Sequence, residues 1–304
     1  MAETAEALVE LRNLSKSFGH IRAVDNLSLS VLRGDIYGFL GPNGSGKSTT
    51  IRMMLSLIRP SSGDLLLFGE RLTERNRSVL HKVGALIERP DFYNYLSAYG
   101  NLEILAGYSG IKPDRKKLLA LLDMVGLAGR EHSRVKTFSQ GMKQRLGIAQ
   151  ALLHDPELII LDEPVNGLDP QGIRDIRELI ITLNRDQGKT FIISSHILRE
   201  MELIANRMVV ISKGRVMAEG HVQSLIRQAS RTLSLLTSKP QETCQLLKTH
   251  FPESSVSLLP TGEIEMQATE EMAPAICRLV VGSGIDLHRL SSRNSLEDYF
   301  LQVI

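Results

Sequence analysis

Residues 36–58, IYGFLGPNGSGKSTTIRMMLSLI, join an apolar run to a glycine-rich loop and then to a helical pattern. We expect residues 36–40 to form a short buried strand and residues 41–47 to form the loop. The helix should run from residue 48 to residue 58 and stop at Arg59-Pro60. A strand, a loop and a helix in this order predict an α/β core whose loop faces a ligand.

The loop fits the pattern G-x-x-x-x-G-K-[ST], in which each fixed residue has a chemical purpose. Glycines let the backbone wrap closely around phosphate groups. Lys47 can reach the β and γ phosphates, and the Ser48 hydroxyl can ligate Mg²⁺. The flanking strand and helix favour this interpretation over an ordinary glycine-rich turn. The residues predicted to contact the phosphates are Gly41, Pro42, Asn43, Gly44, Ser45, Gly46, Lys47, Ser48 and Thr49.

Two more apolar runs end in polar residues. In LIILDEPVNGLDP, residues 158–161 should form a buried strand with Asp162 and Glu163 at its carboxyl end, where parallel sheets bind ligands. Asp162 is suited to hold Mg²⁺ through its water shell, and Glu163 to orient or deprotonate an attacking water. TFIISSH should form a third strand, with His196 at its end. That histidine is either a hydrogen-bonded structural residue or a donor to a γ-phosphate.

A second helix start lies in TFSQGMKQRLG, residues 137–147. Ser139 and Gly141 stand where the helical pattern begins, and free backbone N–H groups together with the helix dipole suit such a position to an anion. An ordinary helix cap accounts for the same residues. The sequence therefore predicts two anion-binding helix starts in one chain.

Composition narrows the class of protein. The chain has 304 residues, 42% of them hydrophobic, enough for one large domain and a small one. Its net charge of +2 gives no sign of a nucleic-acid binder. The acidic start MAETAEALVE does not resemble a signal peptide, no apolar stretch approaches the roughly 20 residues of a membrane span, and the only cysteines are Cys244 and Cys277. We expect a cytoplasmic protein.

Together, these motifs resemble the ATP-binding subunits of ATP-binding cassette (ABC) transporters, from about Val9 to about Ile226. The resemblance implies a P-loop NTPase fold, with a RecA-like core, an antiparallel β subdomain and an inserted α-helical subdomain at about residues 89–155. The predicted nucleotide-binding domain is 1–228. The implied cofactors are ATP and Mg²⁺, and the implied activity is ATP hydrolysis by Glu163, His196 and Lys47.

The same resemblance assigns roles to further residues. Phe18, in SKSFGH, matches the aromatic residue that stacks on adenine, although it can also be a strand-core residue. Asp169, in the Leu168-Asp169 turn, is expected near the nucleotide. Ser139 and Gly141 are expected to close over ATP bound to a facing cassette, so that two chains, most simply a homodimer, enclose two ATP molecules head to tail.

Two positions depart from the family pattern. The signature is Phe138-Ser139-Gln140-Gly141-Met142 in place of Leu-Ser-Gly-Gly-Gln, so we expect Gln140 to have an ordinary backbone conformation. Glu88 stands where the family usually has a glutamine near the metal, and its carboxylate is a candidate ligand. This substitution resembles the branch that exports bacteriocin-like peptides and drugs.

Residues 92–105 are where the family receives a coupling helix from its membrane partner. Phe92, Tyr93, Tyr95 and Leu96 either line that groove or belong to the core of the helical subdomain. The expected partners are integral membrane permease subunits, with the protein peripheral on the cytoplasmic face of the membrane. No nucleic-acid partner is expected.

The chain changes character after MVVISKGRVMAEG, a predicted hairpin that turns at Lys213-Gly214. A helix at about 222–228 should lead to strand, helix, strand, strand, helix and strand in residues 229–304. We expect a small α+β accessory domain, with a ferredoxin-like fold as one candidate, that ends in the helix SLEDYFLQVI. A regulatory or dimer-supporting role would follow from resemblance to exporters with C-terminal extensions.

The predicted function is an ATP-hydrolysing subunit that powers a membrane transporter, an exporter in particular. Three rival classes remain: a P-loop phosphotransferase, a DNA-repair or chromosome ATPase of the same superfamily, and a translation factor of that superfamily. The second normally carries long coiled coils, and the third carries two cassettes. Neither feature is found in this sequence.

Overall fold

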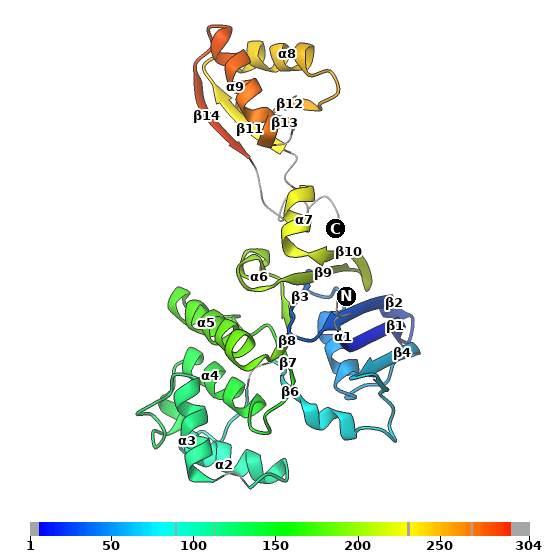
Figure 1. The fold of residues 1–304 in the computed structure, drawn as a ribbon, viewed down its shortest axis with the longest axis vertical. Helices are drawn as coiled ribbons and strands as arrows, with labels where there is room; N and C mark the ends of the chain where they lie inside the picture. The colour runs from blue at the N-terminus through cyan, green and yellow to red at the C-terminus, as the bar shows by residue number, and fades with distance from the viewer. Residues whose placement is uncertain (1–5, 89, 113, 230–231, 269, 293–304) are drawn as a thin grey trace, which may run out of the picture. The chain divides into compact units, whose positions relative to one another are not determined.

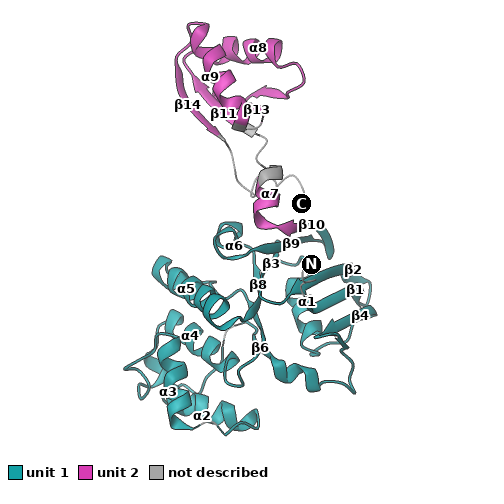
Figure 2. Cartoon of the chain, viewed as in Figure 1, with its two compact units in different colours: residues 1–219 teal, residues 220–304 magenta. Residues whose placement is uncertain are grey.

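The computed structural model describes residues 6–88, 90–112, 114–229, 232–268 and 270–292. The chain divides into two compact units, Met1–Glu219 and Gly220–Ile304 (Figure 2). The predicted boundary at residues 228 and 229 lies farther along the chain, at the end of α7 (Val222–Ala229). No helix in the described ranges is long and apolar enough to cross a membrane.

A six-stranded sheet forms the centre of unit 1, in the order β10-β9-β3-β8-β7-β6. Its strands β3, β7 and β8 are buried along their whole length, as expected for a parallel sheet covered on both faces. The carboxyl ends of β3, β7 and β8 therefore meet at one edge. The bounds are β3 (Ile36–Leu40), β6 (Val83–Leu86), β7 (Leu158–Asp162), β8 (Thr190–Ser195), β9 (Arg207–Ser212) and β10 (Arg215–His221).

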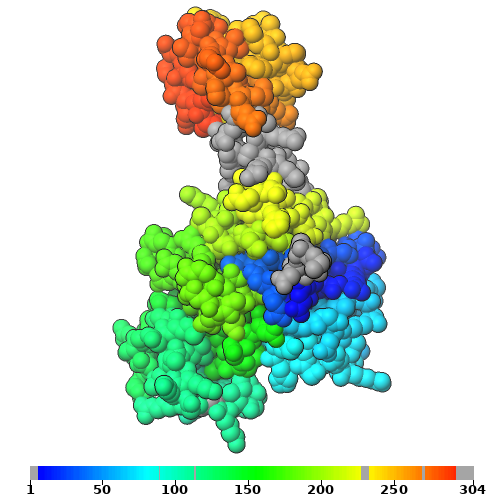
Figure 3. All heavy atoms as spheres, viewed as in Figure 1, coloured from blue at the N-terminus to red at the C-terminus, as the bar shows by residue number. Residues whose placement is uncertain are grey.

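An antiparallel sheet occupies one side of unit 1, in the order β2-β1-β4-β5. It shares a hydrophobic core with α1 and the central sheet. In the space-filling view this region, blue to cyan, lies on the opposite side of the unit from the helical segments, blue-green to green (Figure 3). The bounds are β1 (Ala7–Phe18), β2 (Ile21–Leu32), β4 (Ser62–Leu67) and β5 (Glu70–Arg71).

Helices make up the remainder of unit 1 (Figure 1). The segment predicted as a helical subdomain contains α2, α3 and α4, and the long helix α5 follows β7. The bounds are α1 (Lys47–Met54), η1 (Ser78–Lys82), α2 (Ala98–Tyr108), α3 (Arg115–Met124), η2 (Val135–Thr137), α4 (Gln140–Ala151), α5 (Pro170–Gln187) and α6 (Leu198–Ile204).

Helix α1 is shorter than predicted. It ends at Met54, whereas the sequence pattern predicted a helix as far as Ile58. Ser56 has a left-handed backbone, φ 54°, and the Leu57 N–H returns to the Arg52 carbonyl at 2.9 Å. This is the local geometry that closes a helix, so Arg59-Pro60 does not set its end.

Unit 2 contains the predicted sequence of strands and helices. Its antiparallel sheet has the order β12-β13-β11-β14, which is the ferredoxin-like arrangement of a βαββαβ chain. Leu235, Leu247 and Ile276 are fully buried in its separate core. The predicted helix SLEDYFLQVI lies outside the described residues. The bounds are β11 (Thr232–Thr237), α8 (Pro240–His250), β12 (Val256–Leu258), β13 (Ile264–Gln267), η3 (Glu270–Met272), α9 (Ala273–Gly282) and β14 (Leu287–Ser292).

Candidate functional site

The glycine-rich loop between β3 and α1 depends on its glycines. A Cβ at Gly41 would lie 2.3 Å from the Ile211 carbonyl oxygen, and one at Gly46 would lie 2.6 Å from that of Ala23. Gly46 also has a φ of 108°, which side chains rarely allow. The Gly214 N–H, in the predicted hairpin turn, donates to the Ser45 carbonyl at 2.9 Å. The loop is therefore held in one shape by backbone contacts from distant segments.

Lys47 lies buried beneath this loop, with 6% of its side chain exposed. Its ammonium donates to the Gly41 carbonyl at 2.6 Å and to the Pro42 carbonyl at 3.2 Å, and lies 3.6 Å from Glu163 Oε1. Burial lowers the pKa of Lys47, and the nearby Glu163 charge opposes that shift. The lysine is thus held in place by carbonyl groups and one carboxylate.

The loop and the helix start after it offer polar groups suited to a ligand. Gly46 provides no side-chain cap for α1, so the first N–H groups of that helix face the loop. Ser45 Oγ is buried and has no hydrogen-bond partner among the described residues. Both observations fit an anion held at the start of α1. The hollow there is lined by Ala23, Asn43, Gly44, Ser45, Gly46, Lys47, Ser48, Thr49 and Glu163.

The acidic pair lies at the carboxyl end of β7, as predicted, with Asp162 as the last residue of the strand and Glu163 directly after it. Asp162 is 4% exposed, and Ser194 Oγ on the neighbouring strand β8 donates to its Oδ1. Glu163 has a left-handed backbone, φ 50°, and its N–H donates to the same Ser194 Oγ at 2.9 Å. The turn after β7 therefore depends on β8. Ser194 was missed by the sequence interpretation, although it lies two residues before His196 in the quoted strand.

His196 contacts the acidic pair from the end of β8. Its Nδ1–H donates to Glu163 Oε2 at 2.8 Å, because a carboxylate can only accept. The other carboxylate oxygen faces Lys47. Lys47, Glu163 and His196 thus converge beside the start of α1, and the proposed contact of His196 with a γ-phosphate stays a prediction.

Glu88 lies in the adjoining hollow, which shares Ser48 and Glu163 with the first. Its backbone is left-handed, φ 60°, and its carboxylate forms an ion pair with Arg52 of α1. The sequence interpretation did not include this pairing. The second hollow is lined by Ser48, Glu88, Gln140, Gln144, Asp162, Glu163 and Asn166.

The signature segment begins α4. Ser139 caps the helix, and its Oγ accepts the Met142 N–H at 3.2 Å. Gln140 is the first helical residue and has no positive φ, which confirms the expectation for its backbone. Its Nε2 donates to the Asn166 carbonyl at 3.2 Å. Neither Ser139 nor Gly141 lines the two hollows beside the phosphate loop of the same chain.

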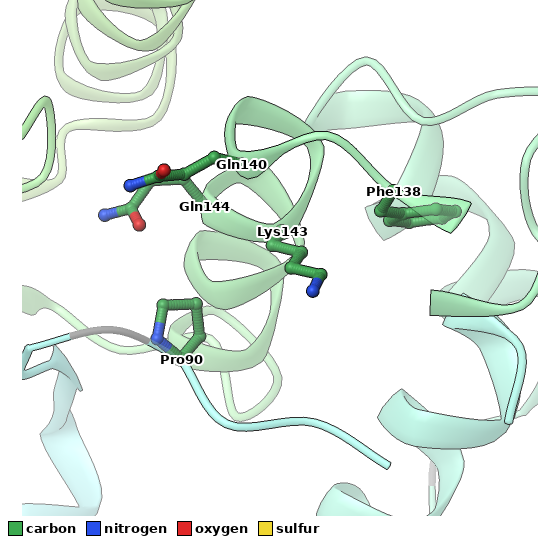
Figure 4. Close-up of a pocket in the computed structure, with 5 residues that line it drawn as sticks. All are labelled: Pro90, Phe138, Gln140, Lys143 and Gln144. Atoms are coloured by element: carbon green, nitrogen blue, oxygen red, sulfur yellow. The ribbon is translucent and has the colours of Figure 1, made fainter. Parts of the chain in front are cut away.

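A third pocket lies beside the signature helix (Figure 4). Gln140 and Gln144 extend from α4 in the same direction, and Pro90 faces them from the segment after β6. A Cβ at Gly147 would lie 3.1 Å from Pro90 Cβ, so this segment packs closely on α4. The pocket is lined by Pro90, Phe138, Gln140, Lys143 and Gln144.

Phe18 and Asp169 lie apart from these hollows. Phe18 ends β1 with half of its surface exposed, and the Lys16 ammonium lies 5.0 Å from its ring centroid. An exposed ring is available for stacking, and it does not belong to the strand core. Asp169 caps α5, since its Oδ1 accepts the Gly172 N–H at 3.0 Å. The nucleotide contacts of both residues stay predictions.

The aromatic cluster divides between core and surface. Phe92 is buried, whereas Tyr93 and Tyr95 are 40% and 68% exposed, with ring centroids 5.9 Å apart. A hydrogen bond with Tyr108 raises the pKa of Tyr93. Fully buried Asn101 holds this loop, because its side chain accepts the Tyr93 N–H at 2.9 Å and donates to the Tyr93 carbonyl at 3.1 Å. The sequence interpretation missed Asn101.

Comparison with known proteins agrees with these motifs. Residues 24–166 match a family described as ABC transporter. The bacitracin transport ATP-binding protein BcrA of Bacillus licheniformis is 40% identical over 298 residues, 98% of this chain and 97% of that protein. The lantibiotic transport ATP-binding protein SrtF of Streptococcus pyogenes is 40% identical over 212 residues, 70% of this chain and 90% of that protein. A dimeric ATP-binding cassette, solved in a post-hydrolysis state with ADP and phosphate, has a TM-score of 0.62 and 26% identity, covering 70% of this chain and 98% of that one.

Proposed function

Because the chain belongs to the ATP-binding proteins of ABC transporters, we propose that it hydrolyses ATP and thereby powers a membrane exporter. The observation that best supports the ATPase activity is that Lys47, Glu163 and His196 converge beside the uncapped start of α1. A cation, a carboxylate and an imidazole gathered at an anion-binding helix start are suited to phosphate chemistry.

The phosphate loop is the proposed binding site for the ATP phosphates. The start of α1 has no side-chain cap, the buried Ser45 hydroxyl has no hydrogen-bond partner in the described part of the chain, and Lys47 supplies a positive charge. The exposed ring of Phe18 is the proposed platform for adenine. ATP therefore satisfies donors that the protein alone leaves open.

Glu163 is the proposed base. One of its oxygens faces Lys47 and the other accepts from His196. Phosphate groups that attract Lys47 would leave the first oxygen available to orient a water and accept its proton, while His196 holds the second. Charge building on the transferred phosphate would be balanced by Lys47 and the loop N–H groups.

Mg²⁺ is the proposed metal, held by Ser48 and Asp162, with Glu88 as a third candidate. The fit rests on the buried Asp162 carboxylate and on the hollow that Ser48, Glu88 and Asp162 line together. The described residues contain no group of three His, Cys, Asp or Glu side chains placed to hold a metal alone. That suits Mg²⁺, which usually keeps waters and phosphate oxygens as ligands. When bound, the ion supplies neutralising charge between the phosphates.

Two chains are the proposed functional unit. Ser139 and Gly141 do not line the hollows of their own chain, and we propose that the Ser139 hydroxyl hydrogen and the Gly141 N–H donate to ATP on a facing cassette. The dimeric cassette among the similar structures supports this arrangement. Asp169 lies in the turn after the acidic strand and is the proposed contact near that shared nucleotide.

A permease is the proposed membrane partner, and the exposed Tyr93 and Tyr95 pair is its proposed contact. This would place the protein on the cytoplasmic face of the membrane, without a nucleic-acid partner. Residues 1–228 would form the nucleotide-binding domain and residues 229–304 an accessory domain. The names of the two antibiotic-transport relatives favour export of peptide-like antibiotics. A non-transport ATPase of the same superfamily is the alternative.

The test uses the full chain and Glu163→Gln. We expect wild type to release phosphate from ATP, with one oxygen taken from ¹⁸O-labelled water. Glu163→Gln should lose turnover by about 100- to 10 000-fold, the usual contribution of a general base, while still binding ATP. Light scattering should show the variant as a dimer with ATP and Mg²⁺ and as a smaller species without them.

Glu157→Gln is the matched control. Glu157 lies just before β7 and pairs with Arg33 and Lys82, away from the hollows. Its variant should hydrolyse ATP at the wild-type rate. Unchanged turnover in Glu163→Gln would remove Glu163 from the base role. Conversion of ATP to ADP that requires an acceptor molecule and releases no free phosphate would favour a phosphotransferase. Co-purification with a polytopic membrane protein would support the transport function over a non-transport one.

A further inference from the structure

Ser194 contacts both carboxylate residues at the carboxyl end of β7, Asp162 and Glu163. β7 and β8 run parallel with Asp162 opposite Ser194, so the serine side chain is placed next to the end of the acidic strand. Ser194 is fully buried. Its Oγ donates to Asp162 Oδ1 and accepts the Glu163 N–H at 2.9 Å. One hydroxyl therefore contacts the side chain of the first residue and the backbone of the second.

The contact with Glu163 holds an unfavourable backbone. Glu163 has a φ of 50°, a region that non-glycine residues adopt infrequently and that persists when surrounding contacts hold it. The hydrogen bond from its N–H to Ser194 is such a contact. The Glu163 carboxylate depends on this backbone for its position between Lys47 and His196.

The contact with Asp162 fixes a carboxylate orientation. Because Oδ1 receives the Ser194 hydrogen, the remaining lone pairs of the carboxylate have a set direction toward the hollow that Asp162 shares with Ser48. The Ser194 hydroxyl has a single hydrogen, so donation to Asp162 leaves it an acceptor for the Glu163 N–H. Both contacts are thus satisfied at once.

We propose that Ser194 is a positioning residue for ATP hydrolysis, which sets the direction of Asp162 and the backbone of Glu163 through one hydroxyl. The inference rests on the proposed ATPase function. Ser194 does not touch substrate. It acts through the two carboxylates, so its loss should lower turnover and raise the Mg²⁺ requirement more than it weakens ATP binding.

Three substitutions separate the hydroxyl from the volume of the side chain. Ser194→Ala removes the hydroxyl, Ser194→Cys keeps the volume with a weak hydrogen-bonding group, and Ser194→Thr keeps the hydroxyl. We expect Ala and Cys to lower kcat by about 10- to 100-fold, the usual cost of removing a group that orients a metal ligand. KM for ATP should change by less than about threefold, and Thr should restore most of kcat.

Thr190→Val is the matched control. Thr190 lies at the other end of β8, is also fully buried, and accepts one backbone N–H, that of Gly34, at 2.8 Å. Its replacement removes a buried hydroxyl far from the carboxylates. The thermal unfolding temperature should fall about as much as in Ser194→Ala, whereas kcat should keep its wild-type value.

Binding of ATP provides a readout that does not depend on turnover. In Glu163→Gln, the Mg²⁺ concentration that gives half-maximal binding of a fluorescent ATP analogue should rise about tenfold when Ser194→Ala is added. A wild-type chain that releases no phosphate would contradict the proposed function. The measurement of Mg²⁺-dependent ATP binding would still test the role of Ser194.

Unchanged kcat and unchanged Mg²⁺ requirement in folded Ser194→Ala or Ser194→Cys would overturn the proposal. A fall in kcat equal to that of Thr190→Val would also overturn it, since both would then reflect loss of stability. If neither Ala nor Cys folds, Ser194 is required for the fold and the positioning role is rejected.

Discussion

Helices α1 and α4 begin in opposite ways. Gly46 precedes α1 with a φ of 108° and no side chain to accept a hydrogen bond. Ser139 precedes α4 with a φ of −63°, and its hydroxyl accepts the Met142 N–H at 3.2 Å. One helix start leaves its donors to a ligand, whereas the other satisfies a donor with its own side chain.

The difference fits the proposal that one chain carries two anion-binding helix starts with different roles. The start of α1 is surrounded by its own loop and by buried Lys47, which fits the proposed binding of an anion within the chain. At the start of α4 the Ser139 side chain accepts one backbone N–H, and a Cβ added at Gly141 would come no closer than 3.9 Å to the nearest side chain among the described residues. A helix start that is capped by its own side chain and is sterically accessible is suited to contact a nucleotide bound to a second chain.

Among the substitutions that test the difference between the two helix starts, removal of the Lys47 side chain should have the largest effect. Lys47→Ala deletes a charge-assisted contact worth roughly 1.5–3 kcal/mol. ATP affinity should therefore fall by about 10- to 150-fold, as measured by equilibrium binding of a fluorescent analogue. Lys143→Ala, which removes a lysine from the first turn of α4, should leave the ATP affinity of the isolated chain unchanged. Equal losses in the two variants would contradict the division of roles.

Ser139→Asp tests whether the capped start meets an anion. Aspartate caps helices as well as serine does, so the free energy of unfolding should stay close to wild type, whereas Ser139→Ala should lose about 0.5–2 kcal/mol. The new carboxylate would repel a γ-phosphate on the facing chain, and ATPase activity should fall by at least about tenfold. An active Ser139→Asp variant would leave Ser139 with a capping role alone.

Gly141→Ala should give the smallest effect on the folded chain. The added Cβ has room, and alanine stabilises a helix by about 1 kcal/mol relative to glycine, so chemical denaturation should show equal or greater stability. ATPase activity should nevertheless fall, because the methyl group would stand between Gly141 and the partner's nucleotide. A more stable variant with full activity would place Gly141 outside the dimer contact.

Features that depend on contiguous residues were predicted well from the sequence. The strand of residues 36–40, the start of α4 after Ser139 and the turn at Lys213-Gly214 each have a local pattern. In unit 2, the alternation between strand-like and helix-like hydrophobic periodicity likewise predicted the order of strands and helices. Local patterns carry this information because hydrophobic period and turn chemistry act over a few residues.

Features that join distant residues were missed. Ser194 lies 32 residues from Asp162, and Asn101 holds Tyr93 through a buried amide. A buried polar residue within an apolar run gives no periodic signal, and its partner is known only when the strands or helices are packed. Glu88 and Arg52 are exposed side chains 36 residues apart, and their pairing too is known only when the segments that carry them are packed. The end of α1 was placed too late because the left-handed turn at Ser56 has no glycine to mark it.

A chain growing on the ribosome cannot complete its phosphate loop when residue 48 emerges. The Ser45 carbonyl accepts the Gly214 N–H, and Ile211 packs where any side chain at position 41 would go. We therefore expect nascent chains to bind ATP only after residue 214 has left the exit tunnel, and to do so before residues 220–304 have folded. ATP binding by stalled chains that end well before residue 211 would show that the loop forms without this late segment.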